Sequence, residues 1–177
     1  MLKMFTTQLT GLFKNISEKE EFAIEDGARL LAQAPAGDGA VYFYGAKEMK
    51  AVLAETMEGA EPLSFAKILT EVEAAELTEA DRVVIFSRYS TDPEAVELAA
   101  RLKEKGIPFV SVSSVNETAG SSDLTKLADV SIHLWLTKGL LPDGQGGRFG
   151  QPFAMAALYV YYGLFFTLNE ILAEYEL

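Results

Sequence analysis

The sequence predicts an α/β fold, a three-layer α/β/α sandwich built around a five-stranded parallel sheet. Short apolar runs, rich in aromatic and β-branched side chains, alternate along the chain with stretches of helical periodicity. Strands that are apolar on both faces are typical of a parallel sheet with helices on both sides, joined by right-handed crossovers. The length of 177 residues suits one domain with a full core, so we expect a single domain over residues 1–177.

Two amphipathic helices precede the sheet within residues 1–35. Apolar residues recur at three- and four-residue spacing in Leu2–Phe13 and in Glu20–Gln33, as they do on one face of a helix. The segment APAGDG follows the second helix and ends it, because proline and glycine favour turns.

The α/β core is expected within residues 40–136, where strand, turn and helix repeat. The predicted strands are Ala40–Gly45, Glu61–Phe65, Arg82–Ser87, Pro108–Ser114 and Asp129–Leu136. The predicted helices between them are Ala46–Glu58, Ala66–Ala75, Pro93–Lys105 and Asp123–Leu127.

A long C-terminal helix is expected over residues 151–176, with an uncharged segment from Pro152 to Leu168. A helix that is apolar on every side is typical of a core helix or of a subunit interface. The segment is also close to the shortest stretch that crosses a bilayer, roughly 17 residues, but acids rather than bases follow it. The sequence therefore favours a buried helix or an interface over a membrane span.

Charge and cysteine content exclude several classes of function. With 15 Lys and Arg against 26 Asp and Glu, the formal net charge of -11 opposes binding to nucleic acid or to an anionic membrane. The absence of cysteine excludes a disulfide framework, a thiolate metal site and a cysteine nucleophile. The N-terminal stretch lacks the continuous apolar core of a secretory signal. We therefore expect a cytoplasmic protein that uses no metal or other cofactor.

Ligands of such sheets bind beyond the carboxyl ends of the strands, near the point where the strand order reverses. The loops after Tyr44, Ser87, Val112 and Leu136 would meet at this rim. Ser113, at the exit of the fourth strand, is one candidate contact.

Motifs at these strand ends resemble those of the sugar isomerase (SIS) domain family, which includes phosphoheptose isomerases. Gly45 matches the first glycine of a G-x-G-x-S motif, and Ser87 and Glu94 match the two ends of S-x-S-G-x-T-x-E. The resemblance covers roughly residues 40–136. It implies a flavodoxin-type SIS fold that binds a sugar phosphate and pairs through its terminal helices. A third motif, S-x-L-x-x-x-A-D, is matched by Ser122, Leu124, Ala128 and Asp129.

The chain departs from both phosphate motifs at the positions that contact the ligand. Lys47 and Met49 replace the second glycine and the serine of the first motif. Tyr89, Ser90 and Asp92 replace the serine, glycine and threonine of the second. Glycine lets the backbone approach a phosphate and hydroxyls donate to its oxygens, neither of which Met49 can do. The sequence therefore supports the scaffold more strongly than it supports the family's phosphate site.

The turn from Ser87 to Glu94 has two interpretations. It binds an anion through hydroxyls and free amides at a helix N-terminus, or it is a helix cap. The cap would be Asp92 before Pro93, or Thr91 paired with Glu94 in a capping box. In the anion-binding interpretation, the candidate contacts at this rim are Gly45, Lys47, Ser87, Arg88, Tyr89, Ser90, Thr91 and Ser113.

A second candidate for anion binding is the loop GQGGRFGQP, Gly144–Pro152. Four glycines, one arginine and a following helix start offer exposed amides, a fixed positive charge and a favourable dipole. The alternative is a plain loop of the same composition. If the chain binds a sugar phosphate, we expect Arg148 to contribute.

Catalytic candidates follow only from the resemblance. Phosphoheptose isomerases use a glutamate on the helix after the first strand and a histidine on the last helix. Glu55 and Glu58 lie in the corresponding helix here, but the last helix has tyrosines and no histidine. A tyrosine is a poor proton shuttle at neutral pH. The only histidine, His133, lies in an apolar strand, where a structural role suits it better than metal binding, which needs a cluster of ligands.

Three functions are consistent with these observations. The first is a sugar-phosphate-binding protein that interconverts aldoses and ketoses, as a homodimer or homotetramer. The second is a noncatalytic module that senses a phosphosugar. The third is an assembly protein whose main element is the apolar C-terminal helix.

Overall fold

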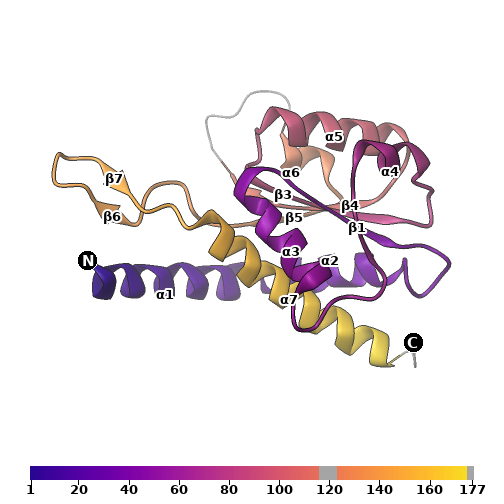
Figure 1. Cartoon of the computed structure of the whole chain (residues 1–177), viewed down its shortest axis with the longest axis horizontal. Coiled ribbons are helices and arrows are strands. Elements are labelled where there is room, and N and C mark those ends of the chain that lie inside the picture. The colour runs from indigo at the N-terminus through magenta and orange to yellow at the C-terminus, as the bar shows by residue number, and fades with distance from the viewer. Residues whose placement is uncertain (116–122, 175–177) are drawn as a thin grey trace.

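The computed structural model describes residues 1–115 and 123–174, and it confirms the predicted α/β sandwich (Figure 1). Ser122 and residues 175–176, to which the sequence assigned a motif position and the end of a helix, lie outside the described residues. Five parallel strands form one sheet in the order β2-β1-β3-β4-β5, in which the direction of strand addition reverses between β1 and β3. The strands are β1 (Val41–Gly45), β2 (Ala66–Ile68), β3 (Arg82–Tyr89), β4 (Phe109–Ser114) and β5 (Val130–His133).

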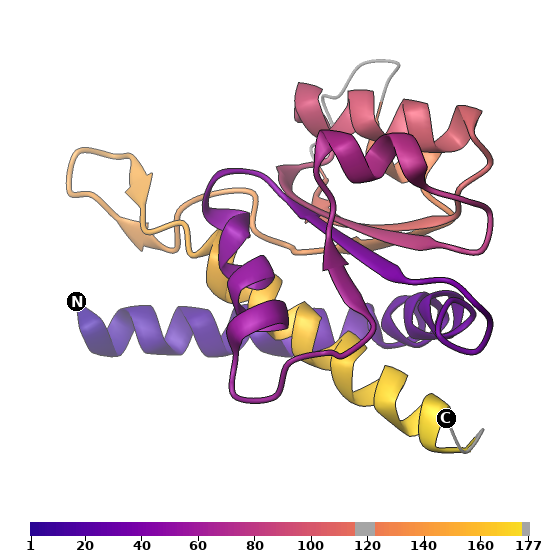
Figure 2. The same ribbon diagram turned by 45° about the vertical axis from the view of Figure 1, so that its right-hand side comes forward.

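Helices cover both faces of this sheet (Figures 1 and 2). One face carries three of these helices, and the other carries the two longest helices among the described residues, α1 and α7. The first layer consists of α4 (Glu71–Glu76), α5 (Pro93–Glu104) and α6 (Leu124–Leu127). The second consists of α1 (Leu2–Lys19), α2 (Glu21–Ala32), the 3₁₀ turn η1 (Lys47–Met49), α3 (Lys50–Glu58) and α7 (Phe153–Glu174).

Strand β3 shows how the sheet joins two apolar cores. Val84 and Phe86 belong to the core on the side of α2 and α7, whereas Val83 and Ile85 belong to the core on the side of α5. All four side chains are fully buried. Because successive side chains of a strand point to opposite faces, a continuous apolar run is what a doubly covered strand requires.

The second strand lies later in the chain than the sequence predicted. The strand expected at Glu61–Phe65 is wrong, since β2 spans Ala66–Ile68, and the helix expected at Ala66–Ala75 is reduced to α4. Ala66 pairs with Val41 of β1, so pairing with the neighbouring strand overrides the local helical pattern. Thr70 then caps α4 by accepting a hydrogen bond from the amide of Glu73.

The last strand is shorter than the predicted Asp129–Leu136. It ends at His133, and Trp135 has a left-handed backbone conformation with φ of +54°. A tryptophan in this region of the backbone is uncommon and breaks the extended conformation. From there the chain leaves the sheet edge.

The glycine-rich segment after β5 forms a projecting hairpin rather than an irregular loop. Strands β6 (Leu141–Pro142) and β7 (Arg148–Phe149) pair antiparallel, and Gly144 and Gly146 in the turn have positive φ. In both ribbon views the hairpin extends beyond the sheet on the side of the N-terminal end of α1.

Helix α7 has one buried face and one exposed face. Its inner side packs against α2 and α3, and eight of its side chains are buried. By length and composition alone it is the one helix, among the described residues, that could cross a membrane. A core helix of this length passes the same test, and the packing of the inner face agrees with the predicted buried helix.

Candidate functional site at the switch point of the sheet

The loops after β1 and β3 diverge to opposite faces of the sheet. In α/β folds of this order ligands bind between such diverging loops, and we call the region between these two loops the crevice. After Gly45 the chain turns through η1 into α3 on one face, and after Tyr89 it turns into α5 on the other. Candidate contacts Gly45, Lys47, Arg88 and Tyr89 therefore come from the two walls of one crevice.

Gly45 makes the first wall a tight turn. A Cβ atom at this position would lie 2.7 Å from the carbonyl oxygen of Met49, a separation that side chains essentially never adopt. Lys47 continues the turn with φ of +54°, and its side chain is exposed. The missing second glycine of the motif is therefore replaced by a lysine in a left-handed conformation.

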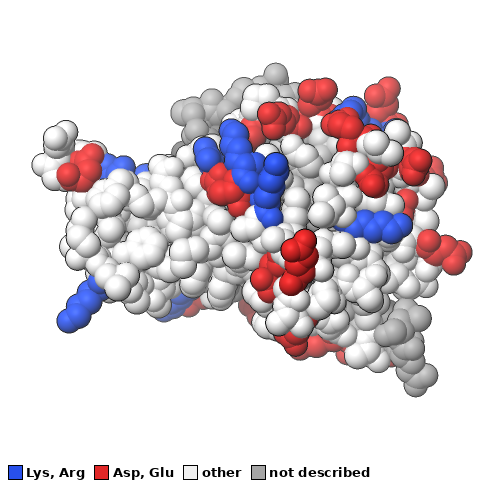
Figure 3. Space-filling view, viewed as in Figure 1, with Lys and Arg blue, Asp and Glu red and all other residues white. Residues whose placement is uncertain are grey.

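Glu48 and Arg88 close the crevice by pairing across it. Arg88 Nε donates to Glu48 Oε1 at 2.5 Å, and a second guanidinium nitrogen donates to Oε2 at 2.7 Å. The two side chains keep about a third of their surface exposed, 33% for Glu48 and 38% for Arg88. The hydrogen bonds from Arg88 hold the pKa of Glu48 below its usual range. Figure 3 shows basic atoms gathered beside acidic atoms above the start of α3.

Asp92 occupies the N-cap position before Pro93, as predicted, but its carboxylate does not cap the helix. It points backwards and accepts hydrogen bonds from the amides of Arg88, at 3.1 Å, and Tyr89, at 3.2 Å. Asp92 makes no capping hydrogen bond to α5, and within the described residues the alternative capping box of Thr91 and Glu94 is not formed either. The carboxylate thus binds two amides of the motif turn, as a bound anion would.

The predicted hydroxyl contacts face the interior. Ser87, Ser90 and Ser113 are fully buried. Ser87 donates to the carbonyl of Tyr89 at 2.6 Å, and Ser90 bonds to Asp123 at 3.0 Å. Ser113 Oγ has no hydrogen-bond partner within the described residues. The hydroxyls of Ser87 and Ser90 therefore make hydrogen bonds inside the protein, whereas Lys47, Glu48 and Arg88 present charge to solvent.

Tyr89 covers the end of the sheet. Its ring packs edge to face on Phe153 at the start of α7, with centroids 5.3 Å apart. Thr91 is half-buried beside it in the turn before α5. This contact makes Tyr89 part of the packing at the end of the sheet.

Glu55 is not part of the Glu48–Arg88 contact. Its partner is Tyr162 on the last helix, α7. Tyr162 donates to Glu55 Oε1 at 2.6 Å, and this bond raises the pKa of Tyr162 to about 12. Glu58, at the end of α3, is exposed. The structure therefore brings one predicted glutamate to the last helix, where its partner is a tyrosine.

Arg148 lies on the projecting hairpin, apart from the carboxyl ends of β1 and β3 (Figure 1). Its guanidinium donates to the carbonyl oxygens of Gly139, at 2.6 Å, and Leu140, at 2.7 Å. These bonds fix the base of the hairpin. The two predicted anion sites are therefore separate places on the molecule.

His133, the last residue of β5, accepts hydrogen bonds from backbone amides through its imidazole ring. Its Nδ1 accepts from the amides of Val115, at 3.1 Å, and Trp135, at 3.2 Å. Burial lowers the pKa of the imidazole. The carboxylate of Glu20 binds the amide of His133 and the indole of Trp135. Within the described residues, no cluster of His, Asp and Glu is arranged to hold a metal ion.

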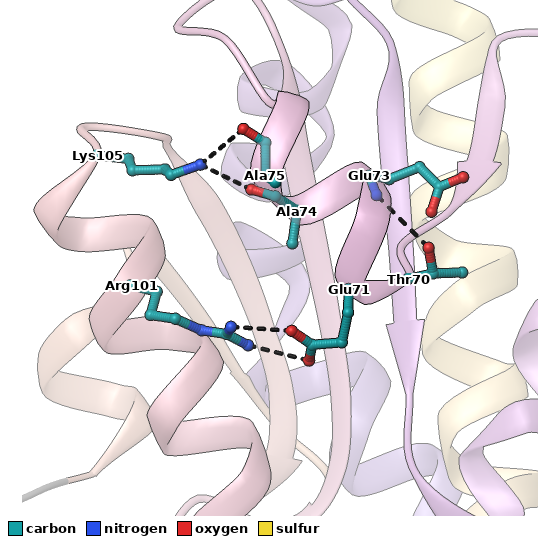
Figure 4. Close-up of polar contacts among 7 residues, drawn as sticks. All are labelled: Thr70, Glu71, Glu73, Ala74, Ala75, Arg101 and Lys105. Carbon is teal, nitrogen blue, oxygen red and sulfur yellow. Dashed lines mark hydrogen bonds and ion pairs between the residues drawn. The ribbon is translucent and has the colours of Figure 1, made fainter.

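A hollow that the sequence did not indicate lies beside Tyr44, on the α4 and α5 side of the sheet. It has a volume of about 560 Å³ and is lined by Thr70, Glu94 and Glu97 among others. Glu71 and Arg101 pair across it through bonds of 2.9 and 3.1 Å (Figure 4). Its acids come from two helices that meet only in the fold, so no local motif marks them.

Comparison with known proteins identifies the family. A family described as "Domain of unknown function (DUF2529)" matches residues 1–172. The chain belongs to this family. An uncharacterized protein of Bacillus subtilis (strain 168), YwjG, is 48% identical over 176 residues, which cover 99% of each chain.

Solved structures place the DUF2529 chain among SIS-like folds. E. coli CFT073 c3406, solved in complex with arabinose 5-phosphate, superposes with a TM-score of 0.65 at 14% identity over 96% of this chain and 88% of its own. Phosphoheptose isomerase GmhA from Neisseria gonorrhoeae gives 0.64 at 12% identity, with 93% and 94% covered. Vibrio vulnificus NanR, complexed with ManNAc-6P, gives 0.64 at 15% identity, with 97% and 61% covered. The DUF2529 chain thus shares its fold with phosphosugar isomerases and with sugar-phosphate-binding regulators.

Proposed function

We propose that this chain binds a phosphorylated sugar in the crevice between the ends of β1 and β3, with Arg88 as the residue that binds the phosphate. The observation that carries this proposal is the partly exposed Arg88 guanidinium, which among the described residues is held only by the carboxylate of Glu48. A phosphate presents two oxygens with the same spacing to the planar fork of an arginine. The ligand would therefore take the place of the Glu48 carboxylate.

Charge balance explains why Glu48 has to move. Asp92 already binds two backbone amides of the turn, and a dianion beside two carboxylates would be repelled. Once Glu48 turns outward, Arg88 and the exposed Lys47 face the ligand, and the charge of Asp92 remains bound to the amides of the turn. The complexes of c3406 with arabinose 5-phosphate and of NanR with ManNAc-6P support a phosphorylated sugar as the ligand class.

A thermal-shift screen tests this proposal. Arabinose 5-phosphate, ManNAc-6P and sedoheptulose 7-phosphate are compared with the same sugars without phosphate and with inorganic phosphate. Ligand binding to the folded state raises the unfolding temperature by mass action. We expect a concentration-dependent rise with at least one phosphorylated sugar and none with its unphosphorylated form. A panel without any rise at millimolar concentration rejects the proposal.

Isomerisation is a second candidate, and the pairing of Glu55 with Tyr162 is the observation that favours it. The pair joins the two helices that carry the catalytic residues of phosphoheptose isomerases, and a carboxylate can move a proton between adjacent carbons. Product analysis with wild type and Glu55→Gln at high protein concentration tests it. Turnover that the substitution abolishes supports an enzyme, and binding without turnover supports a noncatalytic sensor.

A further inference from the structure

Three backbone groups surround one ring nitrogen of His133, at the end of the edge strand β5. Its Nδ1 accepts hydrogen bonds from the amides of Val115, at 3.1 Å, and Trp135, at 3.2 Å. The carbonyl oxygen of Ser113 lies 3.3 Å from the same nitrogen. Because two N–H groups face Nδ1 against one carbonyl, the neutral ring carries its proton on Nε2 and leaves Nδ1 free to accept.

The backbone that this nitrogen holds belongs to a turn that joins the sheet to two helices. Trp135 has φ of +54°, a conformation that large side chains rarely adopt. Its indole donates to Glu20 Oε1 at 2.8 Å, and Glu20 Oε2 accepts from the amide of His133 at 3.1 Å. Glu20 is only 8% exposed and lies between the end of α1 and the start of α2. The turn therefore ties the edge of the sheet to the junction of α1 and α2.

Protonation of the ring changes what Nδ1 can do. An imidazolium carries an N–H on both nitrogens, so its Nδ1 can no longer accept from Val115 and Trp135, and it meets their two N–H groups with its own. The charged ring then faces the carbonyl oxygen of Ser113, which already accepts from the amide of Leu134 at 2.9 Å. One hydrogen bond replaces two, and two backbone amides lose their acceptor.

Two charged side chains act on the ring, and both come from the junction of α1 and α2. The carboxylate of Glu20 favours the charged ring, and the ammonium of Lys19, which lies 4.0 Å from the centroid of the Trp135 ring, disfavours it. Among the described residues, the other elements packed on β5, which are β4, α2 and α6, add no charged group to these two. Burial is the largest effect and lowers the pKa of His133. The neutral ring therefore persists below the ordinary value of about 6.5.

We propose that His133 is a pH-operated latch: when its imidazole takes up a proton, the turn at Trp135 opens and the indole leaves Glu20. The latch consists of His133 Nδ1, the two amides that it accepts from, and the contact of Trp135 with Glu20. It is closed at neutral pH and opens as the pH falls through the pKa of the ring, because the positive φ of Trp135 is then no longer held. The latch needs no ligand, so its test does not depend on the proposed sugar-phosphate site.

The single tryptophan of the chain reports the state of the latch. Its ring centroid lies 4.4 Å from that of His133. Tryptophan emission and acrylamide quenching are measured from pH 8 to pH 4.5, with far-UV circular dichroism at each pH. Below about pH 6.5 we expect a reversible transition with red-shifted emission and an unchanged circular dichroism spectrum. Since Trp135 is 37% exposed in the closed turn, the quenching constant should roughly double on local opening. A folded wild type without this transition overturns the proposal.

Two variants decide which group takes up the proton. His133→Gln keeps a side-chain acceptor and does not titrate, so the transition should vanish. Glu20→Gln keeps an acceptor for the indole but removes the carboxylate that favours the charged ring. Its transition should remain and move to lower pH. A transition that persists in His133→Gln and is lost in Glu20→Gln would assign the proton to Glu20 and overturn the proposal.

Amide hydrogen exchange of the wild type provides a test that needs no variant. Between pH 7 and pH 5, after correction for the intrinsic exchange rate, the amides of Val115 and Trp135 should lose protection by roughly tenfold through local opening. The amide of Asp129, which donates to the carbonyl of Phe109 just before β5, is the matched control and should keep its protection. Unchanged protection at Val115 and Trp135 overturns the proposal, as does an equal loss at all three amides, which would indicate general unfolding.

Discussion

Arg88 and Glu48 lie 40 residues apart in the chain and form a two-bond ion pair across the point where the sheet reverses its strand order. The same place holds the substrate or cofactor in many α/β folds of this topology. Arg101 and Glu71 form a second two-bond ion pair, between α5 and α4 (Figure 4). This pair serves as the control for substitutions of Arg88 and Glu48.

The backward hydrogen bonds of Asp92 should stabilise the turn after β3. Asp92→Ala leaves the partly buried amides of Arg88 and Tyr89 without their acceptor, which we expect to lower the free energy of unfolding by about 1–2 kcal/mol. Asp92→Asn keeps a carbonyl oxygen in the same position, so its free energy of unfolding should fall by less than that of Asp92→Ala. Urea denaturation of the three proteins measures this, and equal stability of Asp92→Ala and wild type would contradict the role assigned to the carboxylate.

Gly45 should not tolerate a side chain. The Cβ of Gly45→Ala would meet the carbonyl oxygen of Met49 at 2.7 Å, so the turn has to shift, at an expected cost of about 1–3 kcal/mol. Gly11→Ala, in α1 with open space around its Cβ, should instead stabilise the helix by roughly 0.5–1 kcal/mol. Denaturation midpoints compare the two, and a neutral Gly45→Ala would show that the first wall of the crevice is loose.

His133 should make the stability of the fold depend on pH. Burial lowers the pKa of its imidazole in the folded protein, so between the ordinary value near 6.5 and the lowered value the unfolded chain binds more protons. The contribution of His133 to the free energy of unfolding is therefore complete above pH 6.5 and is lost as the pH falls through the lowered pKa. Denaturation between pH 5 and 8 should show this loss in wild type and not in His133→Gln. The same dependence of stability on pH in both proteins would mean that titratable groups other than His133 cause it.

Tyr162 should lose its phenolic proton at a higher pH than an ordinary tyrosine. Its hydrogen bond to Glu55 raises the pKa to about 12, against a usual value near 10. In an alkaline absorbance titration, Tyr162→Phe should remove a step near this value, and Glu55→Gln should move that step to lower pH. A last step that Tyr162→Phe leaves in place would mean that the two side chains are not paired in solution.

The sheet could be predicted where both faces of a strand are covered. Val83 to Phe86 are apolar without interruption because each side chain enters one of the two cores. The short edge strand β2 could not be predicted in its correct place. Its three residues belong to a helical pattern in the sequence, and pairing with β1, where Ala66 lies opposite Val41, makes them extended. Edge strands have less burial to mark them, so their bounds follow from tertiary contacts.

The candidate site was predictable in place but not in detail. The positions of Gly45 and Ser87 at strand ends mark the rim, because carboxyl ends of parallel strands meet there. The contact of Arg88 with Glu48 could not be read from the sequence, since it depends on which strands become neighbours. The sequence offered Asp92 or Thr91 as the cap of the next helix, but the carboxylate of Asp92 accepts from two preceding amides instead, which the local sequence pattern did not indicate.

The most direct measurement of the proposed function is a calorimetric titration of wild type and four variants with arabinose 5-phosphate and ManNAc-6P. If Arg88 binds the phosphate, Arg88→Gln should weaken binding at least tenfold, Glu48→Gln should strengthen it by removing the competing carboxylate, and Arg101→Gln should bind like wild type. Arg148→Ala tests in the same series whether the hairpin contributes. Equal affinity of Arg88→Gln and wild type would contradict the proposal.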